Sequence, residues 1–158
     1  MMRRKDRERD RDFALSVVDA CPYATLSMID PEGNPYGVPV NLVRDGDEVY
    51  FHAALEGKKT ACLRHAPRVW ISCVSHARVL ADEYATAYNA AMIAGAAAEV
   101  TDEAEKTRAL RLLCERFVSP RMDKFDEEVS RSLSRTAIWK IHIEAITGKQ
   151  KPDPQRAE

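Results

Sequence analysis

Hydrophobic and polar positions follow two different periods in the first third of the chain. Residues 13–20 carry apolar side chains at helical spacing, and Pro22 ends the helix that they predict. Apolar and polar side chains then alternate over residues 23–29, 38–42 and 49–53, which is the period of a strand. The sequence therefore predicts a short helix followed by three strands.

The segments between these strands are rich in turn-forming residues. Residues 30–35 read Asp-Pro-Glu-Gly-Asn-Pro, and the pair Asp45-Gly46 is a strong signal for a hairpin. Connections this short favour antiparallel neighbours, so we expect the three strands to form a meander.

Segments with the helical period and segments with the strand period also follow one another in the rest of the chain. Residues 57–65 predict a short helix that Pro67 closes, and residues 68–74 predict a fourth strand. Residues 85–100 are ambiguous, because their alanines favour a helix whereas Met-Ile and Gly in the same segment fit a strand. Strict alternation over residues 139–145 predicts the last strand.

Two apolar stripes at helical spacing lie between residues 102 and 133. Asp102 and Glu105 resemble a capping box at the start of the first helix, and Pro120 ends it. We expect both stripes to be packing faces rather than a cofactor-binding surface. They consist of Leu110, Leu113 and Phe117, and of Met122, Phe125, Val129 and Leu133.

Six strands joined mainly by short turns predict a mainly β fold with peripheral helices. An antiparallel barrel is the expected architecture, because closure removes exposed strand edges. No repeat or linker divides the chain, so residues 1–149 are expected to form one domain. Residues 1–11 are almost wholly charged and predict an arm, while the polar residues 150–158 predict a disordered tail.

Charge and hydropathy narrow the classes of function. The formal net charge of −1 argues against a general nucleic-acid binder, which needs a basic excess to neutralise phosphates. No apolar run approaches the ~20 residues of a membrane helix, and the N-terminus lacks the apolar core of a secretory signal. We therefore expect a cytoplasmic protein with no nucleic-acid or membrane partner.

The cysteines and histidines do not follow the spacing of a metal site. The four cysteines form no CxxC pair, and the four histidines show no HxxxH or Cys/His ligand pattern. The sequence predicts reduced thiols and no metal.

The lysine pair Lys58-Lys59 is the first chemically informative feature. It falls in the first turn of the helix predicted over residues 57–65, where the helix dipole disfavours cations. An anion bound at this end would account for both lysines. The alternative is an exposed pair on a surface helix, and the residues alone leave both open.

Four segments resemble the nitroimidazole-resistance (Nim) branch of the FMN-binding split barrels, within the pyridoxamine-phosphate-oxidase superfamily. They are residues 2–8 (MRRKDRE), 35–41 (PYGVPVN), 50–59 (YFHAALEGKK) and 146–149 (ITGK), in the family's order along the chain. The spacing from Lys59 to Pro67 also matches that of the superfamily's phosphate-binding lysine. The resemblance further indicates that residues 88–99 form a strand.

This resemblance implies a six-stranded split barrel that forms a homodimer with two FMN sites at the subunit interface. The phosphate would lie against Lys58 and Lys59, and the ring along the strand from Val38 to Asn41 and near His52. Tyr88 and Trp139 would close the site, one or both from the partner subunit, although Trp139 fits a barrel wall equally well. The implied cofactor-binding residues are Val38, Pro39, Val40, Asn41, Phe51, His52, Lys58, Lys59, Tyr88 and Trp139.

His52 has two interpretations. It alternates with Phe51 and Ala53, so it points away from whatever those residues pack against. It is either a strand histidine satisfied by a backbone partner or the catalytic residue, lining the flavin pocket as proton donor or substrate anchor.

The resemblance implies an FMN-dependent oxidoreductase that passes electrons from NAD(P)H to a small aromatic or nitro-substituted acceptor. Pyridoxamine-phosphate oxidation itself is less favoured, because the sequence shows no second basic cluster for a substrate phosphate. The alternative is a non-catalytic protein that holds flavin, deazaflavin or haem in the same barrel.

Overall fold

The computed structural model describes residues 3–155 and has long strands wherever the sequence predicts them. Residues 88–99, ambiguous by composition, are strand as the resemblance indicated. The six long strands are β2 (Ala24–Ile29), β3 (Pro35–Val40), β5 (Glu48–Ala54), β6 (Arg68–Leu80), β7 (Ala85–Glu99) and β8 (Thr136–Lys151).

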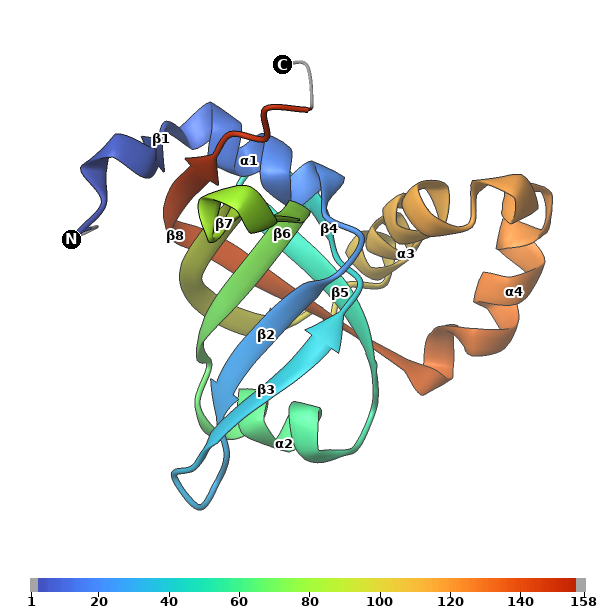
Figure 1. Ribbon diagram of the computed structural model, residues 1–158. Helices are drawn as coiled ribbons and strands as arrows, with labels where there is room; N and C mark the ends of the chain where they lie inside the picture. The colour runs from blue at the N-terminus through green and yellow to red at the C-terminus, as the bar shows by residue number, and fades with distance from the viewer. Residues whose placement is uncertain (1–2, 156–158) are drawn as a thin grey trace.

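The sheet has eight strands rather than the six expected. The additional strands are β1 (Glu8–Arg9) and β4 (Val43–Asp45), which are too short to show an alternating pattern. Neighbouring strands pair antiparallel in the order β3-β2-β6-β7-β8-β5-β4, and β1 pairs with β8. Strands β3 and β4 are the two ends of this order and are not paired with each other, so the curled sheet forms an open, split barrel (Figure 1).

Four α-helices surround the barrel. Asp10 caps α1 and Asp102 caps α3, each accepting a hydrogen bond from the backbone amide three residues on, so the predicted cap at Asp102 is confirmed. In Figure 1, α1 and α2 lie at opposite ends of the barrel, while α3 and α4 stand to one side. The helices are α1 (Arg11–Ala20), α2 (Lys58–His65), α3 (Glu103–Phe117) and α4 (Phe125–Ser132), with 3-10 turns η1 (Lys5–Arg7), η2 (Ala81–Glu83), η3 (Ser119–Lys124) and η4 (Leu133–Arg135).

The inward faces of the strands form the core. Leu26, Ile71, Ile93 and Ile141 are fully buried in it, and so is Phe51 from β5. Burying one such side chain stabilises the fold by about 1.5–3 kcal/mol. The inward-facing residues of the alternating pattern therefore supply most of the driving force for folding.

The long pair β7–β8 is irregular at Gly95. The pairing shifts by one residue between Ala94 and Gly95, which marks a β-bulge. A Cβ atom at Gly95 would lie 2.1 Å from the backbone oxygen of His142. The close approach of the two backbones at this point therefore requires glycine.

The C-terminal segment corrects one expectation. We expected disorder from Gln150, but β8 continues to Lys151, where it pairs with Tyr88. Beyond the strand, the buried carboxylate of Asp153 accepts hydrogen bonds from Arg78 and interacts with His76. Pairing with β7 and the ion pair between Arg78 and Asp153 therefore hold this polar segment against the barrel. Residues 156–158 lie outside the described residues.

The charged N-terminal arm is also held against the barrel. β1 pairs with the end of β8, and Arg9 stacks on Phe13 at 4.6 Å from the ring centroid. Residues 1–2 lie outside the described residues. Within residues 3–155, no helix is long and apolar enough to span a membrane.

Candidate flavin site beside α2 and α3

The junction between β5 and α2 forms a sharp turn at one end of the barrel. Gly57 adopts a φ of +131°, which an L side chain disfavours, and no side chain caps the helix that follows. Thr60 anchors the turn because its hydroxyl donates to the carbonyl oxygen of Ala54 at 3.0 Å. The first backbone amides of α2 therefore remain available to an anion.

Lys59 lies at this junction in a half-buried position. Its Nζ atom is 3.5 Å from the backbone oxygen of His52 and 5.4 Å from the centroid of the Phe51 ring. Burial lowers the pKa of Lys59, and no carboxylate pairs with it within residues 3–155. A desolvated cation without a counter-ion fits the phosphate of a nucleotide cofactor.

Lys58 has a different environment from its neighbour. Its Nζ atom is 3.2 Å from the carboxylate of Asp30 and 4.9 Å from the centroid of the Tyr36 ring. The hydrogen bond to Asp30 raises the pKa of Lys58. Asp30 is buried and also accepts hydrogen bonds from the amides of Glu32 and Asn34, so Lys58 is already engaged in holding the β2–β3 turn.

His52 points out of the barrel, as the alternation predicts. Its neighbours Phe51 and Ala53 are buried in the core, whereas its own side chain reaches solvent. Burial of part of the ring, assisted by the charge of Lys59, lowers the pKa of His52. The imidazole is therefore neutral at pH 7.

The His52 side chain lines a cavity of about 370 Å³ between the barrel and α3. Helix α3 supplies the apolar wall, including the stripe that sequence analysis assigned to packing alone. The lining residues are Asn41, His52, Leu110, Leu113, Cys114, Phe117, Val118, Ser132 and Thr136. The stripe was visible in the sequence, but nothing in it showed that part of the face would border a cavity.

The predicted ring-binding strand β3 shows the expected alternation. Val38 and Val40 point toward the core, and Pro39 is exposed. Asn41 follows the strand, lines the His52 cavity and donates from Nδ2 to the carbonyl oxygen of Pro22 at 3.0 Å. Of residues 38–41, Asn41 is the one that lines the same cavity as His52.

Phe51 and Trp139 lie inside the barrel rather than on its surface. They are cross-strand partners on β5 and β8, and they are 1% and 3% exposed. The Nε1 atom of Trp139 has no hydrogen-bond partner among residues 3–155. In a single protomer, both residues belong to the wall, which is the alternative that the sequence left open for Trp139.

Within one protomer, Tyr88 does not lie beside Lys58 and Lys59. It pairs with Lys151 at the end of β8, whereas His52 pairs with Ile138 near its beginning. Arg7 donates to the Tyr88 hydroxyl at 3.3 Å, and Lys149 lies 5.6 Å from its ring centroid. Although burial opposes ionisation, hydrogen bonds from both cations prevail and lower the pKa of Tyr88. Arg7 and Lys149 thus form a second basic cluster around Tyr88, which the sequence did not show because its members are distant along the chain.

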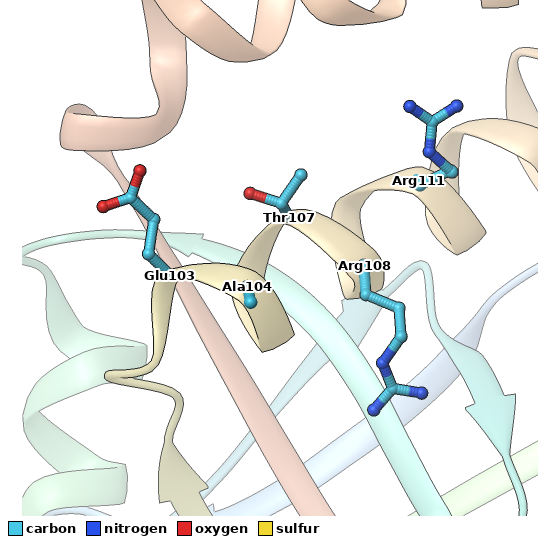
Figure 2. A pocket seen from close by; sticks show the side chains of 5 residues that line it. All are labelled: Glu103, Ala104, Thr107, Arg108 and Arg111. Carbon is cyan, nitrogen blue, oxygen red and sulfur yellow. The ribbon is translucent and has the colours of Figure 1, made fainter.

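A larger hollow of about 580 Å³ lies on the outer side of α3 (Figure 2). All of its lining residues come from that one helix, so nothing encloses a ligand. Arg108 pairs with Asp45 and Arg111 with Asp126, so neither arginine is free to bind a ligand. The hollow is therefore not a candidate site.

Solved structures share this fold along most of the chain. A candidate 5-nitroimidazole antibiotic resistance protein from Bacteroides thetaiotaomicron is 23% identical with a TM-score of 0.72, over 89% of this chain and 84% of that one. The flavocytochrome Anf3 from Azotobacter vinelandii is 21% identical with a TM-score of 0.78, over 100% and 75%. The FAD and heme binding protein from Mycobacterium smegmatis is 21% identical with a TM-score of 0.80, over 96% and 77%.

The sequence itself identifies the family. Among proteins with curated functions, none matches it significantly. The model of the pyridoxamine 5'-phosphate oxidase family, however, matches residues 10–150, which include β5, α2, Lys59 and the cavity beside α3. The superfamily predicted from the motifs is thus confirmed, and the chain belongs to the pyridoxamine 5'-phosphate oxidase family.

Proposed function

We propose that this protein is an FMN-dependent oxidoreductase that passes electrons from NAD(P)H to a small aromatic acceptor. One observation carries the proposal. Lys59 is half-buried without a carboxylate partner, and it contacts the backbone of His52, whose side chain lines an apolar cavity. A cation suited to a phosphate and an apolar cavity thus both adjoin His52.

The donors at the start of α2 suit a phosphate monoester. Such a group carries close to two negative charges, which the Lys59 ammonium and the uncapped amides of α2 complement. FMN would place its phosphate there, and its ring would face the cavity that Asn41 and His52 line, which leaves the cavity itself to the acceptor. When bound, the flavin supplies the hydride and electron transfer, so the chain needs no paired acids or triad.

The residues of this chain bind the acceptor, exclude water and hold a proton donor. Leu110, Leu113 and Phe117 give the cavity an apolar wall that favours an aromatic ring. His52, neutral at pH 7, carries one N–H that can donate a hydrogen bond to a nitro or carbonyl oxygen of the acceptor. We assign it the role of orienting or protonating the acceptor.

We also propose that the protein is a homodimer. The outer face of the barrel carries Trp70, 59% exposed, together with the exposed side chains of Ile29, Val74 and Met92. Small residues surround Trp70, since its ladder partners are Ser27 and Ala94. An apolar patch of this kind, bordered by the ion pair of Arg68 with Glu144, is typical of an interface between copies. A second copy there could bring Tyr88 of the partner subunit to the flavin.

The spectrum of the purified protein tests the proposed function. We expect a yellow protein with flavin absorbance, FMN as the released cofactor by mass spectrometry, and bleaching by NADPH or NADH under anaerobic conditions. A Soret band would instead support a haem-binding role, as the names of several neighbours suggest. A protein that retains no flavin and takes up no added FMN would contradict the proposal.

A further inference from the structure

A second cavity opens beside the one that His52 lines. It has a volume of about 400 Å³ and lies between α3 and the segment η3–α4. The two cavities share the lining residues Leu110, Cys114, Val118 and Ser132, so they adjoin at these residues. The cavity that His52 lines is the inner chamber, and the second cavity is the outer chamber. The outer chamber is lined by Leu110, Cys114, Val118, Arg121, Met122, Lys124, Phe125, Glu128, Val129 and Ser132.

The charges in the two chambers differ. No Asp, Glu, Lys or Arg lines the inner chamber, and its one titratable ring, His52, has a lowered pKa. The charged residues of the outer chamber, Arg121, Lys124 and Glu128, are all exposed to solvent. An ionised group in the inner chamber would lose hydration without gaining a partner, which disfavours charged ligands.

We propose that the two chambers together bind an uncharged, elongated aromatic molecule, with one ring beside His52 and the remainder between α3 and α4. The assignment rests on the proposed function, because it takes this molecule as the electron acceptor. The mixture of leucine, methionine and phenylalanine in the walls suits flat apolar rings. Because the two chambers adjoin, together they suit a molecule longer than a single ring.

Cys114 lies at the junction of the chambers and provides a direct reporter. Its thiol is partly exposed, whereas Cys21, Cys62 and Cys73 are buried. A thiol reagent should therefore modify Cys114 first, at a rate that a ligand in either chamber reduces. Burial raises the pKa of Cys114, so the reaction is best followed near pH 8.

The test uses N-phenyl-1-naphthylamine, an uncharged two-ring fluorescent probe, and its sulfonated analogue 1-anilinonaphthalene-8-sulfonate. With the protein as purified, we expect the neutral probe to gain fluorescence and to slow alkylation of Cys114 by N-ethylmaleimide at least ~10-fold at saturation. The sulfonated probe should bind at least ~10-fold more weakly, since its charge must be desolvated. Equal or tighter binding of the sulfonate, or unchanged alkylation, would overturn the proposal.

Two substitutions test the location of the probe. Cys114→Trp and Val118→Trp each fill the junction and should abolish binding of the neutral probe, and either variant suffices if the other does not fold. Cys114→Ser should bind the probe normally. Ala104→Trp, on the outer side of the same helix (Figure 2), is the matched control and should also bind normally.

Flavin binding is measured on the same variants to separate the two proposals. The location is supported if the junction variants lose the probe and retain the cofactor. Probe binding that survives both junction variants overturns the two-chamber site, whatever the flavin content. Loss of flavin with normal probe binding in the wild type would count against the proposed function alone.

Discussion

The Nζ atom of Lys59 lies 3.5 Å from the backbone oxygen of His52, joining the first turn of α2 to the end of β5. The contact places an ammonium group directly behind the strand residue whose side chain borders the cavity. In the proposed function, phosphate binding and acceptor binding are therefore linked through these two residues. The expected effects of substitutions at and around this junction follow from that arrangement.

His52 should titrate below its ordinary pKa. Burial lowers the pKa from 6.5, and the charge of Lys59 lowers it further. Since the unfolded chain binds the proton more readily, His52 should reduce stability as the pH falls from about 6.5 to its folded pKa, with no further loss below that.

NMR titration of the imidazole is the direct measurement. We expect a midpoint below 6.5 in the wild type and a midpoint closer to 6.5 in Lys59→Met. The free energy of unfolding of His52→Gln, measured with denaturant, should lack the part of the pH dependence that His52 contributes. A wild-type midpoint at or above 6.5 would show that the ring is neither desolvated nor close to the ammonium.

Gly95→Ala should strongly destabilise the fold. The added methyl group would lie 2.1 Å from the backbone oxygen of His142, and backbone atoms at a bulge cannot move aside cheaply. We expect a loss of about 3 kcal/mol or more in the free energy of unfolding, measured by urea denaturation. Gly37→Ala is the control, because its Cβ would meet only the Thr25 methyl at 3.7 Å. Similar small losses at both positions would mean that β7 and β8 are further apart than described.

Arg116 should fix α3 over the cavity. Its guanidinium donates to the backbone oxygens of Leu42, Val18 and Cys21 at 2.9, 3.1 and 2.6 Å. Arg116→Met removes these three hydrogen bonds, so we expect a loss of about 2–4 kcal/mol in unfolding free energy. The exposed Arg121→Met should change stability by less than about 0.5 kcal/mol. Equal effects of the two substitutions would indicate that Arg116 is not anchored.

Much of the local structure follows from the sequence, since it depends on neighbouring residues. Alternation predicts β5 and the outward direction of His52. The hairpin at Asp45-Gly46, however, joins β5 to the short strand β4 rather than to β3, so the expectation that the first three strands form a meander was wrong. The alanine-rich segment of β7 needed the family resemblance. Its small side chains carry little strand preference, and the pairing with β6 and β8 decides its conformation.

The cavity and the second basic cluster could not be predicted from the sequence, for a different reason. Leu110 and His52 border the same space although they are distant in sequence, and so do Arg7, Tyr88 and Lys149 in the cluster. The periodicity of the sequence does not reveal such long-range contacts, because they depend on how α3 and the N-terminal arm pack on the barrel. The unequal environments of Lys58 and Lys59 likewise depend on the position of Asp30.

Trp70→Glu should yield monomers if the outer face of the barrel is the subunit interface. Trp70 is 59% exposed within an apolar face, and a carboxylate there would be buried without a partner in the dimer. Sedimentation at micromolar concentration should show a wild-type dimer and a monomeric variant. Tyr84→Glu is the control, because Tyr84 is 99% exposed in a turn and should not affect assembly. A monomeric wild type that holds flavin would contradict the interface.

The affinity of Lys59→Met for FMN tests the central claim most directly. Losing one charge-assisted contact of ~1.5–3 kcal/mol should raise the dissociation constant roughly 10- to 150-fold in a fluorescence titration. Lys58→Met, whose lysine is already paired with Asp30, should cause a smaller loss. Riboflavin, which has no phosphate, should bind the wild type and Lys59→Met with similar weakness. FMN binding by Lys59→Met as tight as that of the wild type would show that the phosphate lies elsewhere.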